Sequence, residues 1–276
     1  PITKVILGLK DPMFAEVIDV ERITPGMIRV LFAGGDLDDF EATEFTDQYI
    51  NGYFVPADAP YSVPFDLDEV RNLGDDLRPR PRRFTVRKWD ENTKTLTIDF
   101  VVHGDTGYAG PWAKRATPGD RLQFKGPNGS YSPSADVDWH FFAGDETAIP
   151  GISASIESLS PNAHCVVFLV VDSGEFELPF QSAATVDVKW LHRENSPDPS
   201  SLLLEAVKEF DFLSGTYDVF VHGEAGEVRE LRKYLLNEKS VDPNLASISP
   251  YWRRNHTDEA WRKVKKEWLA DQENDF

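Results

Sequence analysis

At 276 residues the chain exceeds the size of a typical single domain, and its 41% hydrophobic and 28% charged residues are usual for a globular protein. The 47 acidic residues outnumber the 29 basic ones and give a formal net charge of −18. This charge repels nucleic-acid phosphates and anionic lipid surfaces. We therefore expect two domains in a cytoplasmic protein that binds neither nucleic acid nor membrane.

The longest apolar run, at 165–171, is far shorter than the ~20 residues that span a bilayer. The first residues lack a basic region followed by a long apolar core, so no secretory signal is expected. The single cysteine, Cys165, excludes an internal disulfide and a thiolate metal cluster. Its position in the apolar run predicts a buried side chain.

The first half of the chain reads as antiparallel β-structure. Segments rich in β-branched and aromatic residues lie at 14–24, 28–33, 47–55, 82–90, 95–103 and 121–125, separated by turn residues. In 95–103 the residues Leu96, Ile98, Phe100 and Val102 alternate with mostly polar ones, which predicts a half-buried strand with His103 facing away from the interior. Residues 56–81 are rich in Pro and Asp and are expected to form a surface excursion.

The second half alternates apolar strands with helices. The strands are expected at 139–145, 165–172, 186–193 and 217–224, and the helices near 147–159, 200–210 and 224–238. Continuously apolar strands alternating with helices indicate a parallel sheet covered on both faces. The tail 257–270 places Trp261, Val264, Lys265 and Trp268 at helical spacing, which predicts an amphipathic C-terminal helix.

A basic strand stands out in this acidic chain. Arg82 and Phe84 should point to one side of the strand and Arg83 and Thr85 to the other, with Arg87 on the side of Arg83 if the strand is regular. Guanidinium groups suit phosphate oxygens, and an aromatic ring beside a hydroxyl suits a flat heterocycle. A solvated edge strand whose charges prevent aggregation is the alternative.

A glycine-rich turn follows the next strand. Glycines 104, 107 and 110 allow close backbone approach to a ligand, and a helix is expected to start near Pro111. A turn of this kind leading into a helix is a common pyrophosphate site. Such turns also simply join strands, so this signal alone is weak.

Seven segments then occur in register along the chain: RRFTVR (82–87), DFVVHGDTG (99–107), PWAKRATPGD (111–120), GPNGSY (126–131), AGDETAIP (143–150), HGEAGEVRELRKYL (222–235) and YWRRNHTDEAW (251–261). Together they resemble the siderophore-interacting protein family. Its members are flavin-dependent ferric-siderophore reductases within the ferredoxin-reductase-like superfamily. The resemblance spans most of the chain and is weakest in 1–45 and 56–80.

The resemblance implies a six-stranded antiparallel FAD-binding β-barrel over 1–135 and a parallel-sheet NAD(P)H-binding α/β domain over 136–276. The family's Arg-x-aromatic-Thr-x-Arg signature falls on Arg82, Phe84, Thr85 and Arg87, with Phe84 in place of the commoner Tyr. The residues expected to bind FAD are Arg82, Phe84, Thr85, Val86, Arg87, Asp99, His103, Gly104, Asp105, Ala109, Trp112 and Ala113. Those expected to bind the nicotinamide cofactor are Gly144, Asp145, Glu146, Thr147, Ala148, Gly223, Glu224 and Ala225.

The resemblance also implies a substrate. Arg253 and Arg254 match the family's C-terminal motif and are expected to attract a ferric siderophore, with a solvated turn as the alternative. Asn51 lies where family members often carry Lys. This departure weakens the basic pocket and leaves the charge of the chelate open, so a neutral hydroxamate chelate is a serious candidate.

The implied activity is transfer of electrons from NAD(P)H through FAD to chelated Fe(III), with release of Fe(II). A monomer without a metal site or covalent nucleophile of its own is expected. A general flavin reductase of the same fold with another acceptor, and an FAD-carrying siderophore-binding protein without turnover, stay open as alternatives. The family favours NADPH as donor, and reduced ferredoxin is a further option.

Two residues of the second half bear on the donor. Asp172 ends a strand where an acid can bind a ribose hydroxyl, which favours NADH, whereas Arg193 could accept the 2′-phosphate of NADPH. His140, His164 and His192 lack partners at ligand spacing and are expected to be structural.

Overall fold

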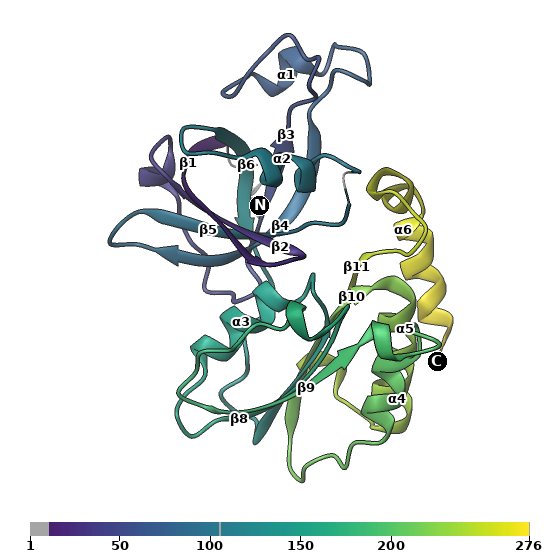
Figure 1. Ribbon diagram of the computed structural model, residues 1–276. Coiled ribbons are helices and arrows are strands. Elements are labelled where there is room, and N and C mark those ends of the chain that lie inside the picture. The colour runs from purple at the N-terminus through teal and green to yellow at the C-terminus, as the bar shows by residue number, and fades with distance from the viewer. Residues whose placement is uncertain (1–10, 105, 276) are drawn as a thin grey trace, which may run out of the picture. The chain divides into compact units, whose positions relative to one another are not determined.

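The computed structural model describes residues 11–104 and 106–275 and divides the chain into two compact units (Figure 1). The barrel unit contains residues up to 129, apart from the short segments Ile23–Met27 and Phe45–Asp47. Those two segments and the residues from Ser130 onward form the sheet unit.

Six strands close the barrel in the order β1-β2-β5-β4-β3-β6. They are β1 (Met13–Thr24), β2 (Met27–Ala33), β3 (Tyr49–Phe54), β4 (Arg80–Asp90), β5 (Thr95–Val101) and β6 (Arg121–Asn128). The interior is filled by side chains that are at most 1% exposed, among them Val30, Phe32, Ile50, Ile98 and Phe100. The predicted six-stranded antiparallel barrel is thus confirmed.

Strand β5 differs from its prediction because both of its faces are covered. Thr97 and Asp99 are only 8% and 4% exposed, and Asp99 is buried by its ion pair with Arg29 on β2. The expected half-buried alternation is therefore wrong. The strand ends at Val101, so His103 lies beyond it, where strand alternation no longer sets its direction, and it is exposed.

The predicted surface excursion lies between β3 and β4 and is mostly exposed. It carries a single turn of helix, α1 (Leu67–Val70), in which the Asp66 carboxylate accepts the N–H groups of Asp68 and Glu69. The side chain of Gln123 on β6 bonds both the N–H and the C=O of Phe65, each at 2.8 Å, and so anchors the excursion to the barrel.

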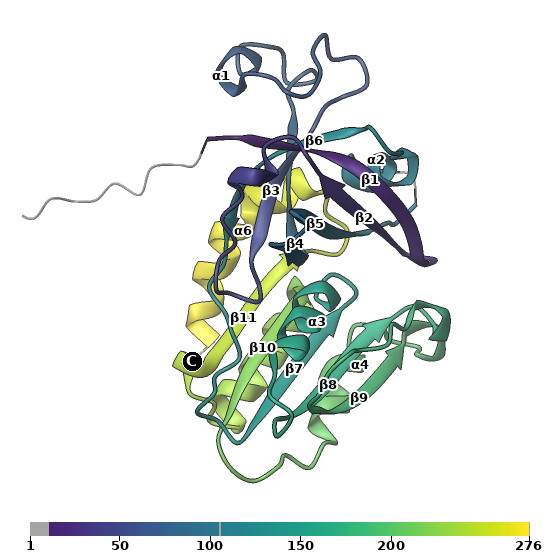
Figure 2. The same cartoon turned by 90° about the vertical axis from the view of Figure 1, so that its left-hand side faces the viewer.

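The sheet unit is built on five parallel strands in the order β11-β10-β7-β8-β9. Its strands are β7 (Trp139–Asp145), β8 (His164–Val171), β9 (Thr185–His192), β10 (Tyr217–Glu224) and β11 (Ala246–Trp252). Helices α4 (Leu202–Lys208) and α5 (Ala225–Lys233) cover one face of the sheet, and α3 (Ile149–Ser158) covers the other (Figures 1 and 2). The predicted parallel sheet covered on both faces is confirmed.

The remaining helices are short or terminal. Helix α2 (Ala109–Arg115) follows β5, a π-helical turn (Tyr234–Glu238) extends α5, and α6 (Asp258–Gln272) is the predicted C-terminal helix. Single 3₁₀ turns lie at Leu37–Asp39, Gly174–Phe176, Arg193–Asn195, Pro243–Leu245 and Glu273–Asp275. Over the residues that the structure describes, none of these helices has the length and apolar character to cross a membrane.

Candidate functional site

The arginines of β4 lie on both sides of the strand, as predicted up to Thr85. The guanidinium carbon of Arg82 lies 5.6 Å from the ring centroid of Tyr108, which precedes α2. Arg83 instead lies 5.1 Å from the ring of Tyr49 on β3. The Arg82 side is therefore the one shared with the glycine-rich turn and α2.

A β-bulge between Val86 and Lys88 breaks the alternation of β4. The prediction that Arg87 lies on the side of Arg83 assumed a regular strand, so it does not apply. The Arg87 side chain is 14% exposed, and its Nε lies 3.9 Å from the carboxylate of Asp99. Asp99 also accepts two bonds from Arg29, at 2.7 and 2.8 Å. One buried carboxylate thus orients two guanidinium groups.

Arg29 did not figure among the expected site residues, although a signal for it exists. It interrupts the otherwise apolar strand MIRVLFA, where an unpaired charge would be costly. Its partner Asp99 is the one acid of β5. These two charges in neighbouring apolar strands could have suggested the pair.

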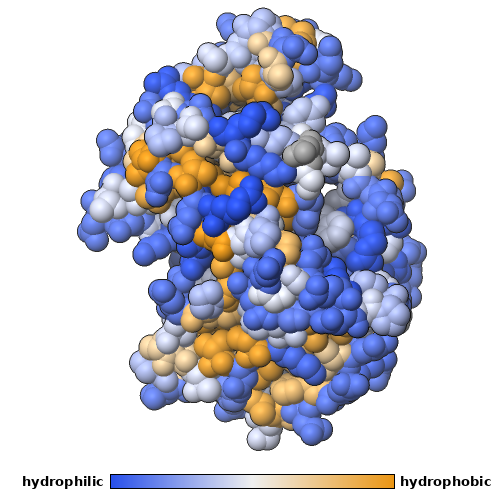
Figure 3. Space-filling model, in the orientation of Figure 1, coloured by the Kyte–Doolittle hydropathy of each residue, from blue (hydrophilic) through white to orange (hydrophobic). Residues whose placement is uncertain are grey.

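Aromatic rings surround the Arg82 side of β4. Phe84 lies 4.6 Å from Phe100 and 5.8 Å from Phe54 between ring centroids. Trp112 of α2 lies 5.6 Å from both of those rings. Phe84, Ala109 and Trp112 are only partly buried against the core, and the space-filling view shows apolar surface on the barrel unit interrupted by strongly hydrophilic side chains (Figure 3). Such a surface can hold a flat heterocycle that carries phosphates.

Two residues of the expected FAD set point into the barrel core. The side chains of Val86 and Ala113 are 2% and 0% exposed, and the N–H of Val86 donates to the carbonyl of Gln48. Their side chains therefore support the site from the core side and do not face the surface. Thr85 is half-buried on the side of Arg83.

The turn between β5 and α2 is exposed at His103 and Gly104. Gly104 and Gly107 have φ values of +56° and +85°, and a Cβ placed on either would meet nothing within 4 Å. Glycine is favoured at both positions because of the positive φ and not because of crowding. The space beside the turn is open. The Lys114 ammonium donates to the Gly104 carbonyl, and the predicted residue Asp105 lies outside the described residues.

In the sheet unit, the turn after β7 is organised by the carboxylate of Asp145, which is 1% exposed. One oxygen accepts the N–H of Thr147 at 2.8 Å. The other accepts the N–H of Glu224 at 2.9 Å and the indole N–H of Trp252 at 2.8 Å. Burial, followed by the neighbouring Glu146 charge, raises the pKa of Asp145 to about 6.

Glu224 plays a similar part after β10. Its carboxylate caps α5 by accepting the N–H groups of Gly226 and Glu227 at 2.7 and 3.0 Å. Its other oxygen accepts the backbone N–H of Arg254 at 2.9 Å. The Arg254 guanidinium pairs at 2.6 Å with Glu227, and burial, followed by the Asp145 charge, raises the pKa of Glu227 to about 7.

Arg253 and Arg254 lie in the segment before α6, where the Arg254 side chain is 39% exposed. Arg254 is held by two glutamates, and the Arg253 guanidinium carbon lies 4.4 Å from the ring centroid of Trp268 on α6. Asn51, the third residue expected to meet substrate, lies on β3 opposite Arg83 of β4 and Lys125 of β6. The substrate role of all three stays a prediction.

Glycines and alanines make the turns of the sheet unit compact. A Cβ on Gly144 would lie 2.2 Å from the carbonyl oxygen of His222 and 2.6 Å from the Cβ of Ala148. Gly223 has a φ of +148°, which favours glycine. Ala148 and Ala225 are 1% and 0% exposed. These four residues therefore let the ends of β7 and β10 approach each other closely.

Arg193, which was expected to be available to a phosphate, is engaged by two carboxylates. Its two terminal nitrogens bond Glu146 at 2.9 and 2.7 Å, and one of them also bonds Asp172 at 2.9 Å. Although burial disfavours its charge, the bonds and charge of Glu146, followed by the bond to Asp172 and the charge of Asp145, raise the pKa of Arg193 above its usual value.

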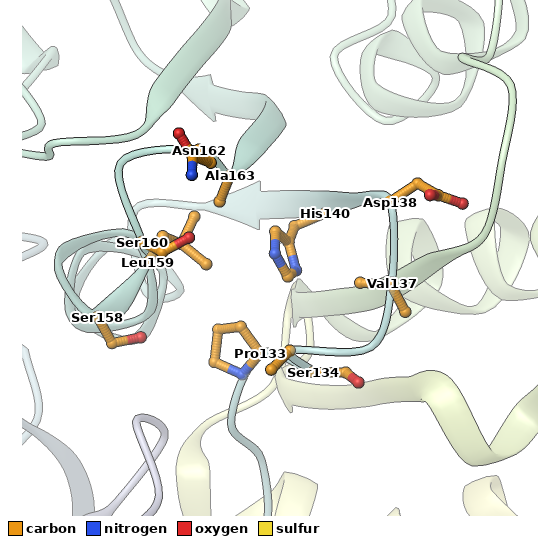
Figure 4. A pocket seen from close by; sticks show the side chains of 11 residues that line it. Pro133, Ser134, Val137, Asp138, His140, Ser158, Leu159, Ser160, Asn162 and Ala163 are labelled. Atoms are coloured by element: carbon orange, nitrogen blue, oxygen red, sulfur yellow. The ribbon is translucent and has the colours of Figure 1, made fainter.

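A cavity of the sheet unit lies at the opposite end of its strands. It has a volume of about 290 Å³ and is lined by the segment before β7 and the end of α3. The imidazole of His140 points into it (Figure 4) and bonds Asp218 at 2.7 Å. Open parallel sheets bind ligands at the carboxyl ends of their strands, so this cavity is not the expected cofactor site.

The three expected structural histidines each have a carboxylate partner. His164 bonds Asp187 at 2.6 Å and His192 bonds Glu177 at 2.7 Å, in addition to the pair of His140. Within 11–104 and 106–275, no group of three or more His, Cys, Asp or Glu side chains could hold a metal ion. Cys165 is buried, as predicted.

Comparison with known proteins assigns the chain to a family. Residues 16–131 match the family model for the siderophore-interacting FAD-binding domain, and 137–255 match that for siderophore-interacting protein. A protein of Mycobacterium tuberculosis is 40% identical over 271 residues, which cover 94% of this chain and 95% of that one. The chain belongs to the siderophore-interacting protein family.

Named members of the family are also similar to this chain. The ferric vibriobactin reductase of Vibrio cholerae is 30% identical over 262 residues, covering 92% of this chain and 94% of the relative. The NADPH-dependent ferric-chelate reductase of Escherichia coli is 28% identical over 242 residues, covering 86% and 91%. The names of both relatives describe reductases that act on chelated ferric iron.

Solved structures agree with this membership of the siderophore-interacting protein family. A siderophore utilization protein from T. fusca superimposes with a TM-score of 0.77 at 31% identity, covering 90% of this chain and 95% of that one. The ferredoxin-NADP+ reductase of Plasmodium falciparum shares the fold, with a TM-score of 0.64 at 10% identity and coverage of 87% and 97%. The two-unit architecture is therefore ferredoxin-reductase-like.

Both cofactors implied by the siderophore-interacting family can be tested against the residues present. For FAD, the barrel supplies the Arg82 and Arg87 guanidinium groups beside the partly buried rings of Phe84 and Trp112. For a nicotinamide nucleotide, the sheet supplies turns at the carboxyl ends of its strands and the Asp172 carboxylate, which is 54% exposed. The donor sets fit both groups.

Proposed function

We propose that this protein is an FAD-dependent ferric-siderophore reductase that takes electrons from NAD(P)H and releases Fe(II) from the chelate. The observation that carries the proposal is the surface on β4, where Arg82 and Arg87 accompany the partly buried Phe84 in an acidic chain. Relatives of the same family named as ferric reductases support it.

The barrel unit would hold the flavin. Arg82 and Arg87 would bind its diphosphate and Phe84 would pack on its ring, while the role of Thr85, on the Arg83 side of the strand, stays a prediction. The open backbone of His103 and Gly104 would approach the diphosphate from the turn before α2. FAD, when bound, supplies the chemistry that accepts two electrons as a hydride and passes them on singly to iron.

The sheet unit would hold the nicotinamide nucleotide along the turns 144–148 and 223–225. The carboxylates of Asp145 and Glu224 stabilise these turns. Asp145 accepts the backbone N–H groups of Thr147 and Glu224. Glu224 caps α5 and also accepts the backbone N–H of Arg254. They keep the turns rigid so that the donor is oriented, and orientation is the protein's main contribution to such a reaction.

We also propose that the protein works in the cytoplasm as a monomer with a ferric siderophore as its small-molecule substrate. Arg253, Arg254 and Asn51 stay the candidate residues for the chelate. Because both arginines already have partners, a neutral hydroxamate chelate fits this chain better than a strongly anionic one. Reduced ferredoxin is the alternative electron donor.

Anaerobic absorption spectra test the proposal. Purified protein is expected to be yellow, to bleach on addition of NADH or NADPH, and to recover its colour on addition of a ferric hydroxamate while a ferrous trap reports Fe(II). Protein that binds FAD but stays oxidised with both nucleotides would point to ferredoxin as donor. Failure to take up FAD would contradict the proposal at its first step.

A further inference from the structure

Three charged residues occupy equivalent positions on neighbouring strands. Strand β7 ends at Asp145, β8 at Val171 and β9 at His192, so Glu146, Asp172 and Arg193 are the first residues beyond three adjacent parallel strands. The strand register brings the three ends together, since Asp145 lies opposite Val170 and Val171 opposite His192. We call these three residues the strand-end trio.

The trio is an ion-pair network whose three side chains carry a net charge of −1, because one guanidinium faces two carboxylates. Arg193 bonds both oxygens of Glu146, at 2.9 and 2.7 Å, and one oxygen of Asp172 at 2.9 Å. The Glu146 side chain is 9% exposed and that of Arg193 is 17% exposed, whereas Asp172 is 54% exposed. The outward-facing charge of the trio is therefore a carboxylate.

The place of the trio suggests what this carboxylate meets. In doubly wound sheets an acid shortly after the second strand binds the ribose hydroxyls of a dinucleotide, while an arginine nearby can accept a 2′-phosphate. Strand β8 is the second strand of this sheet in chain order and lies next to β7. Arg193 could reach a phosphate only by giving up its two bonds to Glu146, which would separate a nearly buried carboxylate from this guanidinium.

We propose that the strand-end trio selects a nucleotide with a free 2′-hydroxyl over one with a 2′-phosphate, so that NADH is the preferred donor. Asp172 accepts hydrogen bonds from the ribose hydroxyls, and Glu146 holds Arg193 away from phosphate binding. This inference rests on the proposed function, in which the sheet unit binds the nicotinamide nucleotide, and it names the residues that choose between the two donors.

Calorimetric titration of the FAD-loaded full chain with 5′-AMP and with adenosine 2′,5′-bisphosphate tests the proposal without turnover. Wild-type protein should bind 5′-AMP more tightly. The isosteric changes Glu146→Gln and Asp172→Asn each remove one negative charge. Each should shift the ratio of the two dissociation constants roughly tenfold toward the bisphosphate, because a charge-assisted bond becomes available to it. Asp172→Asn alters an exposed side chain and serves if Glu146→Gln does not fold.

The matched control is Asp187→Asn, which removes one charge from the other end of β9, where Asp187 pairs with His164. It should leave the ratio of dissociation constants unchanged. Tighter binding of the bisphosphate to wild type, or an equal shift in the control, overturns the role of the trio while leaving the proposed reductase intact. If neither nucleotide binds and neither NADH nor NADPH bleaches the flavin, the proposed donor site and the trio's role fail together.

Discussion

Gly144 shows how closely single residues constrain the sheet unit. It lies opposite His222 in the pairing of β7 with β10, and a Cβ there would sit 2.2 Å from the His222 carbonyl oxygen. Because the obstacle is the backbone of a central strand, it cannot rotate away as a side chain would. The neighbouring Asp145 also depends on this spacing, since it bonds Glu224 at the end of the same partner strand.

Gly144→Ala is therefore expected to lower the free energy of unfolding by about 3 kcal/mol, the upper end of the usual cost of overpacking, because the obstacle is backbone. Guanidinium unfolding followed by tryptophan fluorescence measures the change. Gly110→Ala is the matched control. Gly110 lies in α2, and a Cβ there would meet its nearest neighbour, Val102, at an ordinary distance of 3.7 Å. Equal stability of the Gly144→Ala variant and wild type would show that the two strands can separate without cost.

Arg82 and Arg87 carry the residue-scale prediction for flavin binding. Replacing both with Ala should release FAD without unfolding the chain, because two guanidinium groups that suit the diphosphate are lost. Asp99 keeps its bidentate partner Arg29 in this variant, so this buried carboxylate stays paired. The ratio of flavin to protein absorbance after gel filtration measures the loss.

Arg83→Ala is the control for that experiment. Arg83 lies on the same strand but faces Tyr49 on the other side, so its removal should leave the flavin content unchanged. Full flavin occupancy in the Arg82 and Arg87 variant would place FAD elsewhere. Equal loss in the control would indicate a general effect of charge on the barrel.

At the scale of elements, the spacing of apolar residues predicted most of the strands and helices. A strand or helix that packs on a core places its apolar residues at a spacing typical of that element. Strand β11 was not predicted. Its sequence ASISPYW lacks a continuous apolar run, because two serines and Pro250 interrupt it, and it exists because β10 offers an edge for parallel pairing. Proline is tolerated there because β11 is itself an edge strand, where a missing N–H breaks no further pairing.

The candidate site was predictable in its residue types and less so in its partners. The β-bulge at Arg87 depends on pairing with β5, which local sequence does not report. The partners of Arg193 lie 21 and 47 residues away in the chain, in Asp172 and Glu146. Parallel topology brings them together, so their mutual neutralisation follows from the fold and not from any motif.

The carboxylates around Glu227 give the sheet unit a pH dependence. Burial and the Asp145 charge raise the pKa of Glu227 from 4.5 to about 7. A carboxyl group whose pKa is raised by folding binds more protons when folded, so its contribution to stability is full below the unfolded pKa and is lost as the pH rises through the folded one. The relevant window therefore runs from about pH 4.5 to about pH 7.

Glu227→Gln should remove this loss, because glutamine resembles the protonated side chain. At about 1.4 kcal/mol per pKa unit, the variant should gain about 3 kcal/mol relative to wild type between pH 4 and pH 8. Urea unfolding of both proteins across that range measures the difference. Taking the difference cancels groups that do not interact with Glu227, such as His222, whose pKa burial lowers to about 3. A constant difference across this pH range would contradict the assignment.

At the scale of the whole molecule, the net charge of −18 sets how charged substrates approach. The two arginines expected at the chelate site already contact other side chains, so they do not fully offset this negative charge. Arg254 is paired with Glu227, and Arg253 lies over the ring of Trp268. An anionic chelate should therefore be repelled over distances comparable to the Debye length, whereas a neutral chelate should not.

This repulsion predicts that raising the salt concentration changes kcat/KM for an anionic chelate but not for a neutral one. Raising the ionic strength from about 0.01 M to about 0.15 M shortens the Debye length from about 30 Å to about 8 Å. The kcat/KM for an anionic ferric citrate complex should then rise severalfold, while that for a neutral ferric hydroxamate should stay constant, because only the first substrate feels the screened field. Stopped-flow reoxidation of the reduced protein with each chelate measures both. A fall in kcat/KM for the anionic chelate would instead show that local basic side chains dominate its approach, and Arg253→Ala and Arg254→Ala would then identify which of them does so.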